Sequence, residues 1–210
     1  MASTCFIILA ALVISIIDVD VVEPYPEGAP ESTCKDMRPQ HKVGKNDSNP
    51  LIDPMGGISV YMIQASKKEN VMPGDKVEVT IMSNAPEEYF EGFQVQARSK
   101  DEEVTDVSTI MRYGTFTVND ARVKTLCENG SVTHAVHEHM HNVSFTWTAP
   151  SQKLENIVFK ATVVKGYSTF YMHLKSDVIN ENNSCNNVIP SIAIMAFAAI
   201  FALNQARSNY

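Results

Sequence analysis

Apolar side chains alternate with polar ones along several central segments of this 210-residue chain. The alternation is found in Lys76–Ile81, Val143–Trp147 and Ile157–Val163. Because successive side chains of a β-strand point to opposite faces, a period of two predicts strands with one buried and one wet side. A lone tryptophan in such a segment, Trp147, is expected to fill the centre of the core.

Five further segments are rich in strand-forming residues and are separated by turn residues. They are Ser59–Ala65, Gly92–Arg98, Gly114–Val118, Val123–Leu126 and Phe170–Lys175. Glycine, proline, asparagine and aspartate mark the breaks, as in Met72–Asp75 and Glu128–Gly130. About eight strands at this spacing, without a long amphipathic helix, predict an all-β fold: an antiparallel immunoglobulin-like β-sandwich.

An apolar run near the N-terminus, Cys5–Ile17, has the length of a signal-peptide core and is short for a membrane span. We therefore expect residues 1–22 to be a signal peptide, although cleavage anywhere up to about Pro24 is compatible with the sequence. Residues 23–178 then form one domain, long enough for a substantial core.

A second apolar run, Val188–Leu203, lies within the predicted tail 188–210 and follows a polar, small-residue segment, 179–187. Small residues, a polar spacer and an apolar tail form the pattern of a glycosylphosphatidylinositol signal. The candidate attachment residues are Asn182, Asn183, Ser184 and Cys185. A single-pass anchor and a buried or amphipathic helix are the alternatives. Either kind of anchor would hold the folded part on the outer cell surface.

Charge and sequons agree with an extracellular protein. The formal net charge of −7 argues against a nucleic-acid partner, which would select a basic face. Four Asn-x-Ser sequons agree with secretion and predict glycosylation at Asn46, Asn129, Asn142 and Asn182.

Three cysteines remain once Cys5 leaves with the signal peptide. In an oxidising compartment Cys34 and Cys127 are the natural pair, and Cys185 is the odd one beside the anchor signal. A zinc site is the alternative, but the chain contains no Cys-x-x-Cys spacing.

Several motifs arrive in the order typical of a reeler domain. The proline-rich leader Pro24–Met55, expected to be irregular, opens with Tyr25–Pro30, and Cys34, Met37, Pro39 and His41 follow. Later motifs are Gly92–Arg98, Cys127, Thr133-His134 and Phe145–Pro150. Over about Tyr25–Lys175 the chain resembles the module found in reelin, F-spondin, ferric-chelate reductase-like proteins and small insect defense proteins of the noduler type. The resemblance implies a β-sandwich and a Cys34–Cys127 disulfide, and it supplies no catalytic residues.

Two clusters are candidates for binding. His137, His139 and His141 would share one face of an extended segment and are weak candidates for a copper or zinc site, with a solvated connection as the favoured alternative. The segment Lys35–Lys45 concentrates positive charge; Lys35, Arg38, Lys42 and Lys45 are candidates for contacting anionic lipid or microbial polysaccharide, unless they form only a solvated loop.

No signature of an enzyme is found in the sequence: it has no Gly-x-Ser-x-Gly elbow, His-Glu-x-x-His or phosphate-binding glycine loop. We therefore expect a non-enzymatic protein without a cofactor. The leading hypothesis is an innate-immune protein that recognises or coats microbes through their surface polymers. A cell-surface or matrix adhesion module and a metal-handling accessory to membrane redox are the alternatives. The sequence does not determine the oligomeric state.

Overall fold

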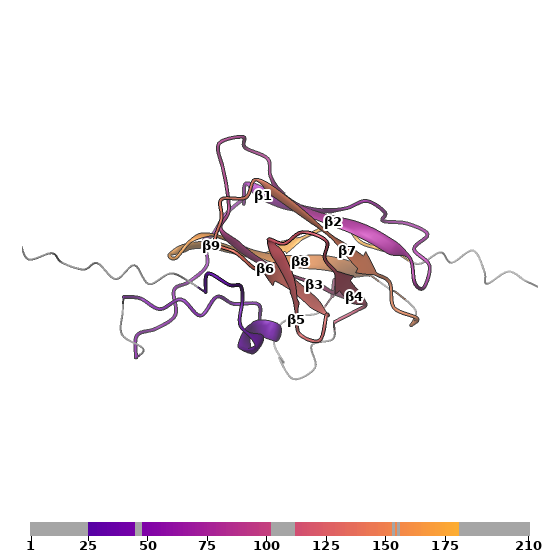
Figure 1. The fold of residues 1–210 in the computed structure, drawn as a ribbon, viewed down its shortest axis with the longest axis horizontal. Helices are drawn as coiled ribbons and strands as arrows, with labels where there is room; N and C mark the ends of the chain where they lie inside the picture. The colour runs from indigo at the N-terminus through magenta and orange to yellow at the C-terminus, as the bar shows by residue number, and fades with distance from the viewer. Residues whose placement is uncertain (1–24, 45–47, 102–111, 153, 155, 181–210) are drawn as a thin grey trace, which may run out of the picture.

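Two antiparallel sheets form the fold (Figure 1). The computed structural model describes residues 25–44, 48–101, 112–152, 154 and 156–180. The four-stranded sheet, in the order β1-β2-β7-β4, contains β1 (Tyr61–Ala65), β2 (Lys76–Ser83), β7 (Asn142–Thr148) and β4 (Thr115–Thr117). The five-stranded sheet, in the order β5-β6-β3-β8-β9, contains β5 (Val123–Leu126), β6 (Ser131–His134), β3 (Gly92–Ser99), β8 (Ile157–Gly166) and β9 (Thr169–Lys175).

The prediction of an all-β antiparallel sandwich is confirmed. Each of the eight predicted segments contains a strand, with ends that differ by a few residues at most. The structure adds β6, which the sequence did not show because all four of its residues are buried and no alternation marks it. No helix among the described residues has the length and apolarity needed to cross a membrane. The predicted signal peptide and C-terminal tail lie outside the described residues.

Aromatic side chains from both sheets fill the space between them. Trp147 is fully buried, meets Phe159 edge-on at 5.2 Å between ring centroids, and donates its indole N–H to the Tyr113 carbonyl at 2.8 Å. Phe93 of one sheet stacks on Phe145 of the other at 6.0 Å. Trp147 therefore lies in the core with its one hydrogen-bond donor satisfied. This position was predicted from its occurrence as a lone tryptophan in an alternating strand.

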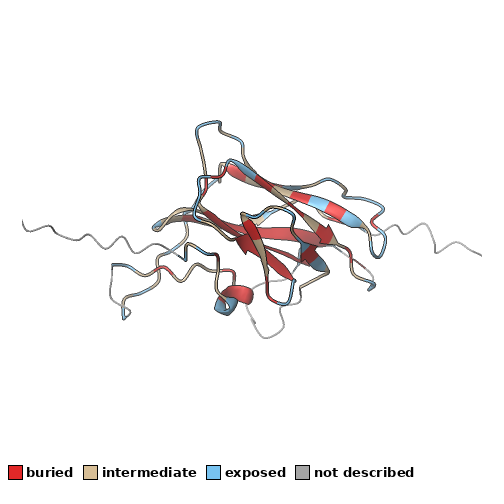
Figure 2. Cartoon of the chain, in the orientation of Figure 1, coloured by how far each residue is buried: buried red, intermediate tan, exposed pale blue. Residues whose placement is uncertain are grey.

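The two sheets differ in how their outer faces are covered (Figure 2). Along β2, buried and exposed residues alternate at first, as predicted for a strand with one wet side. In β8 the residues Ile157–Val163 are all buried, so the prediction of a wet side is wrong for this strand. The first seven residues of β3 are buried as well. The polar side chains of β3 are buried because an N-terminal segment covers them. We call this segment, residues 25–55, the leader.

The compact fold continues past the last strand. Ile179, which the sequence placed in the polar segment before the tail, is fully buried and forms a bridge with Ile157. The Asn180 amide donates to the Lys68 carbonyl at 2.8 Å. The end of the described chain is therefore held against the sandwich.

Candidate functional site

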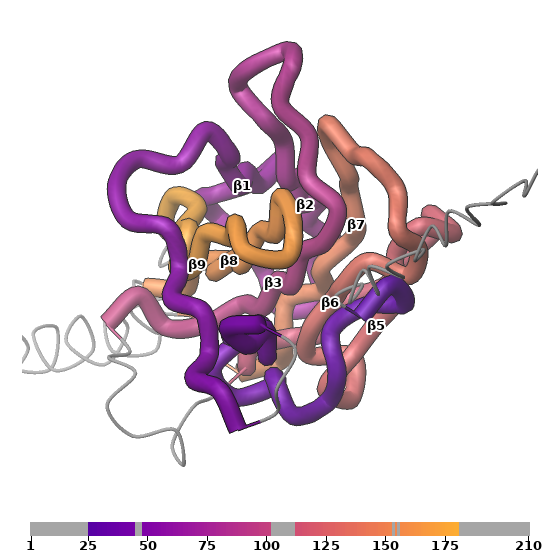
Figure 3. The backbone as a smooth tube through the Cα atoms, turned by 90° about the vertical axis from the view of Figure 1, so that its left-hand side faces the viewer, coloured from indigo at the N-terminus to yellow at the C-terminus, as the bar shows by residue number. Residues whose placement is uncertain are grey.

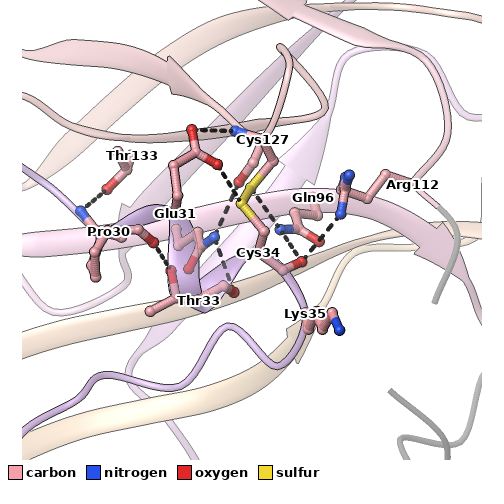
Figure 4. The surroundings of a disulfide bond; sticks show 12 residues. Pro30, Glu31, Thr33, Cys34, Lys35, Gln96, Arg112, Cys127 and Thr133 are labelled. Carbon is pink, nitrogen blue, oxygen red and sulfur yellow. Dashed lines mark hydrogen bonds between the residues drawn. A yellow bond between two sulfur atoms is a disulfide. The ribbon is translucent and has the colours of Figure 1, made fainter. Parts of the chain in front are cut away.

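The leader lies along the outer face of the five-stranded sheet (Figures 1 and 3). Its described residues are irregular, as the prolines predicted, apart from one turn of 3-10 helix, η1 (Glu31–Cys34), and an isolated bridge between Lys42 and Leu51. A disulfide joins Cys34 at the end of that turn to Cys127 after β5, with a Cα–Cα distance of 5.7 Å (Figure 4). The pair is the one that the resemblance implied.

Long polar side chains from β3 supply hydrogen bonds to the leader backbone. Gln96 donates through Nε2 to the Cys34 carbonyl at 3.2 Å. Arg98 donates through Nη2 to the carbonyls of Lys35 at 2.7 Å and Cys34 at 3.3 Å, while its Nε donates to Gln96 Oε1 at 2.8 Å. The backbone carbonyls of an irregular segment have no hydrogen-bond partners in a β-sheet, and a buried carbonyl needs a hydrogen-bond donor. These side chains provide the partners.

Shorter hydroxyl side chains attach the leader on either side of this network. Thr162 of β8 donates to the Met37 carbonyl at 2.8 Å, and Thr133 of β6 accepts from the Ala29 amide at 3.0 Å. Gly28 is needed where the leader passes β6, because its φ is +104° and an added Cβ would lie 2.2 Å from the His134 carbonyl oxygen. The leader is thus attached at several points along its first half.

A pocket remains between the leader and the sheet. Its cavity volume is about 40 Å³, room for a few water molecules or a small chemical group. Apolar groups make up much of the lining, contributed by Tyr25, Ala29, Pro30, Met37, Pro39, Phe93 and Val164. The polar lining comes from Thr33, Gln40, His41, Glu91, Gln94, His134, His137 and Thr162, with Gly92 between them. The mixture suits a ligand group that is largely apolar with a few polar atoms.

His134 forms one wall of the pocket and links the leader to β3. Its Nδ1 accepts from the Phe93 amide at 3.2 Å, so its Nε2 carries the proton and donates to the Tyr25 carbonyl at 3.1 Å. Gly92 makes room for the ring, since an added Cβ would lie 2.9 Å from His134 Cε1. Burial lowers the pKa of His134, because the charged imidazolium loses its hydration there.

A carboxylate and two imidazoles meet at the rim of this pocket. His137 Nε2 lies 3.3 Å from Glu91 Oε2, and His139 Nε2 lies 3.1 Å from Glu91 Oε1. The His139 ring stacks on Tyr89 at 3.7 Å between centroids. We call Glu91, His137 and His139 the rim cluster.

A sequence profile identifies the family. The Reeler domain profile matches residues 32–187. The chain belongs to the Reeler domain family. It is 37% identical over 155 residues to Putative defense protein 3 of Antheraea mylitta, covering 72% of this chain and 83% of the relative. It is 31% identical to Putative defense protein of Bombyx mori over 175 residues, 80% of this chain and 91% of the relative.

Two other comparisons are with a ferric-chelate reductase and with a solved reeler structure. Putative ferric-chelate reductase 1 of Xenopus laevis is 31% identical over 177 residues, which are 82% of this chain but only 26% of that protein. The crystal structure of the human F-spondin reeler domain has a TM-score of 0.51 at 20% identity, over 70% of this chain and 97% of that one. The latter likeness supports the reeler fold.

The three histidines of the predicted metal site have different partners in the structure. The segment between β6 and β7 is irregular apart from an isolated bridge at Met140, whereas the prediction assumed a continuous extended segment. The Nδ1 of His141 faces the Glu88 carbonyl at 2.9 Å, whereas His137 and His139 both face Glu91. Glu91 directly precedes β3, more than 40 residues before the histidines in the chain, and no local spacing in the sequence could have shown it.

The structure does not bring the predicted basic residues together as one open patch. Arg38 is engaged by Asp53 at 2.9 Å and by the Ile52 carbonyl at 3.0 Å. Lys35 is exposed, Lys42 is half-buried beside the Tyr167 hydroxyl, and Lys45 lies outside the described residues. Of the three described basic residues, none lines the pocket. Sequence reasoning missed the pocket because it forms only when the leader folds back on the sheet.

The predicted glycosylation and lipid-attachment residues fall into two groups. Asn129, in the turn between β5 and β6, and Asn142, the first residue of β7, are both exposed and so are accessible to an attached glycan. Asn46, Asn182, Asn183, Ser184 and Cys185 lie outside the described residues.

Acidification is expected to destabilise the domain through His134. Below about pH 6.5 the unfolded state takes up a proton that the buried imidazole resists, because the folded pKa is lowered. Stability is therefore complete above that pH and falls as the pH decreases toward the folded pKa, by up to about 1.4 kcal/mol per pH unit for one histidine. Urea unfolding between pH 7.5 and 5 measures the slope. His41 and His173 have lowered pKa values too and act in the same direction.

The variant His134→Gln isolates the contribution of this residue. It should be less stable at pH 7.5 and lose stability less steeply on acidification, since one of the three histidines with a lowered pKa is gone. Equal slopes for the variant and the native protein would mean that His134 does not cause the pH dependence.

Proposed function

We propose that this reeler protein is an extracellular, non-enzymatic defense protein that recognises or coats microbes. The observation that carries the proposal is its match to defense proteins over most of their own length, 83% for the Antheraea mylitta relative. The expected signal peptide and C-terminal anchor belong to the same proposal and would present the domain outside the cell or on its outer surface.

The pocket under the leader is the recognition site in this proposal. It is concave, its lining mixes apolar groups with a few polar ones, and its walls are held by the disulfide and by the side chains of β3. A site attached to a rigid sheet needs little reorganisation on binding. Its volume suits one end of a larger molecule, such as a sugar substituent or the tip of an acyl chain on a microbial surface polymer.

Positive charge on the leader has a secondary role in this proposal. Lys35 is exposed, and its backbone carbonyl is fixed by Arg98. It can attract an anionic polymer toward the pocket even though the whole chain is acidic. Contacts of this kind are screened at physiological salt, where the Debye length is about 8 Å.

Filling the pocket is expected to weaken microbial binding. The variant Ala29→Phe places a ring among the apolar lining groups and should weaken binding to bacterial cells and to immobilised lipopolysaccharide or peptidoglycan by at least about tenfold, since the ligand group loses its cavity. The variant Lys35→Gln should weaken binding less and reduce its dependence on salt. Binding isotherms at two salt concentrations measure both effects.

A matched control is Ala121→Phe, which adds the same ring at an exposed position that does not line the pocket. Circular dichroism should show both phenylalanine variants folded. If both bind like the native protein, the pocket is not the recognition site. If the native protein binds no bacterial surface, the adhesion hypothesis replaces the proposal.

A further inference from the structure

His41 is a buried imidazole with one ring nitrogen left unused. Only 4% of the residue is exposed, and its Nδ1 lies 2.6 Å from the Tyr167 carbonyl oxygen. A carbonyl only accepts, so Nδ1 carries the proton and donates it to this contact. Burial lowers the pKa of His41, so the ring is neutral above about pH 6.5. Its Nε2 is therefore a hydrogen-bond acceptor, and no donor of the described residues reaches it.

The pocket under the leader borders this ring. His41 lines the pocket, whereas Tyr167, which accepts from Nδ1, does not, so Nε2 is the polar ring atom left for a group inside the pocket. The ring stacks on Tyr167 at 4.8 Å and meets Phe170 edge-on at 5.9 Å between centroids, which fixes its orientation. A buried acceptor without a donor costs free energy, and a ligand group that donates to it recovers this cost.

Most side-chain donors of the pocket lining are already engaged by the protein. The hydroxyls of Thr33 and Thr162 and the Nε2 of His134 donate to backbone carbonyls of the leader. The side-chain amides of Gln40 and Gln94 donate to backbone carbonyls as well. The hydrogen-bonding capacity that remains open in the pocket is therefore mainly that of acceptors, which suits a ligand group with donors.

Glu91 adds negative charge to the same pocket. Its side chain lines the pocket and is 18% exposed, and its ion-pair contacts in the described part of the chain are with His137 and His139. Imidazoles carry positive charge only when protonated, so above about pH 8 these contacts supply no cation to the carboxylate. A cationic group elsewhere in so small a pocket would be attracted by this charge through space, without touching Glu91.

We propose that the pocket holds a protonated primary amine on a short apolar stem, with the Nε2 of His41 accepting one of its N–H groups. The stem lies against the apolar lining, and the charge of Glu91 favours the ammonium over a neutral hydroxyl of similar size. Ionised phosphate and carboxylate groups only accept hydrogen bonds and are repelled by the same charge. The inference rests on the proposed function and makes it specific, because the recognised part of the microbial surface polymer is then an amine-bearing substituent.

Three small probes of equal chain length test the inference: n-butylammonium, n-butanol and butyrate. In ligand-observed NMR titrations of the full-length mature protein at about pH 8, butylammonium should bind at least about tenfold more tightly than butanol, because charge-assisted hydrogen bonds are the stronger ones. Butyrate should show no saturable binding. Equal affinities for butylammonium and butanol, or no binding of butylammonium, overturn the inference.

Substitutions at His41 and Glu91 locate the amine. His41→Asn keeps a donor for the Tyr167 carbonyl but lacks Nε2, so it should weaken butylammonium binding by at least about tenfold. His41→Gln, whose longer amide extends toward the position of Nε2, should recover part of that loss. Glu91→Gln should reduce the preference for butylammonium over butanol.

Glu87→Gln is the matched control, because it removes the same charge from an exposed residue that does not line the pocket. It should bind butylammonium like the native protein. Equal effects of Glu87→Gln and Glu91→Gln, or native affinity in His41→Asn, would contradict the assignment of the amine to this pocket.

Acetylating the free amines of bacterial cells separates this inference from the proposed function. Acetic anhydride converts the ammonium groups to neutral amides, so the native protein should bind treated cells at least about tenfold more weakly than untreated cells. If both bind equally, the amine inference fails while microbial recognition stands. Binding of butylammonium without binding to any bacterial surface would uphold the amine site and contradict the proposed function.

Discussion

Replacing both bonded cysteines, by Cys34→Ser and Cys127→Ser, is expected to lower the free energy of unfolding by about 2–5 kcal/mol. The disulfide links residues 93 positions apart, and closing a loop of that length removes unfolded-state entropy worth about 4–5 kcal/mol in the chain-entropy model. Urea unfolding at neutral pH measures the loss.

The surroundings of the disulfide add to the effect. Cys34, Leu126 and Cys127 form a small buried cluster of their own, partly covered by Ala29. Glu31 accepts from the Cys127 amide at 3.3 Å, so the turn that carries Cys34 depends on this contact as well (Figure 4). Reduction of the native protein with dithiothreitol is the control and should give a similar loss. A loss below about 1 kcal/mol in both experiments would contradict the expectation.

The sandwich was predictable because its signals are local. Alternation with a period of two marked β2 and β7, and turn residues separated the strands. Where both faces of a strand are buried, alternating polar residues can face another protein segment instead of solvent. Gln94, Gln96 and Arg98 are polar because they hydrogen-bond to the leader, and a sequence pattern cannot distinguish such a face from a wet one.

The candidate site was less predictable because it depends on contacts between distant segments. The histidines of the rim cluster stood out by their spacing, but their carboxylate partner comes from a distant segment that precedes β3. The basic residues also stood out, yet Asp53 engages Arg38 once the leader folds. The local sequence shows which side chains could form a site. Which of these side chains come into contact depends on how the leader packs against the sheet.

Replacing Arg98 by alanine is expected to release part of the leader and to cost about 3 kcal/mol of stability. Arg98 is 2% exposed, and its guanidinium donates to two leader carbonyls and to Gln96. Hydrogen bonds from a charged donor contribute about 1.5–3 kcal/mol, and their loss leaves the carbonyls of Cys34 and Lys35 with fewer partners in a dry environment. Urea unfolding measures the stability, and hydrogen exchange of the Met37 amide, bonded to the Thr33 carbonyl, measures release of the leader.

Two further variants separate the hydrogen-bond geometry of Arg98 from its charge. Arg98→Lys keeps the charge but lacks the planar fork that reaches several acceptors at once, so it should recover only a minor part of the loss. Arg122→Ala removes a partly exposed arginine paired with Asp120, which should cost less than about 1 kcal/mol and leave the exchange of Met37 unchanged. If Arg98→Ala behaved like Arg122→Ala, attachment of the leader would rest on its other contacts, which include the disulfide, Gln96, His134 and the threonines. The pocket would then depend on these contacts, and removing the disulfide should by itself weaken any binding there.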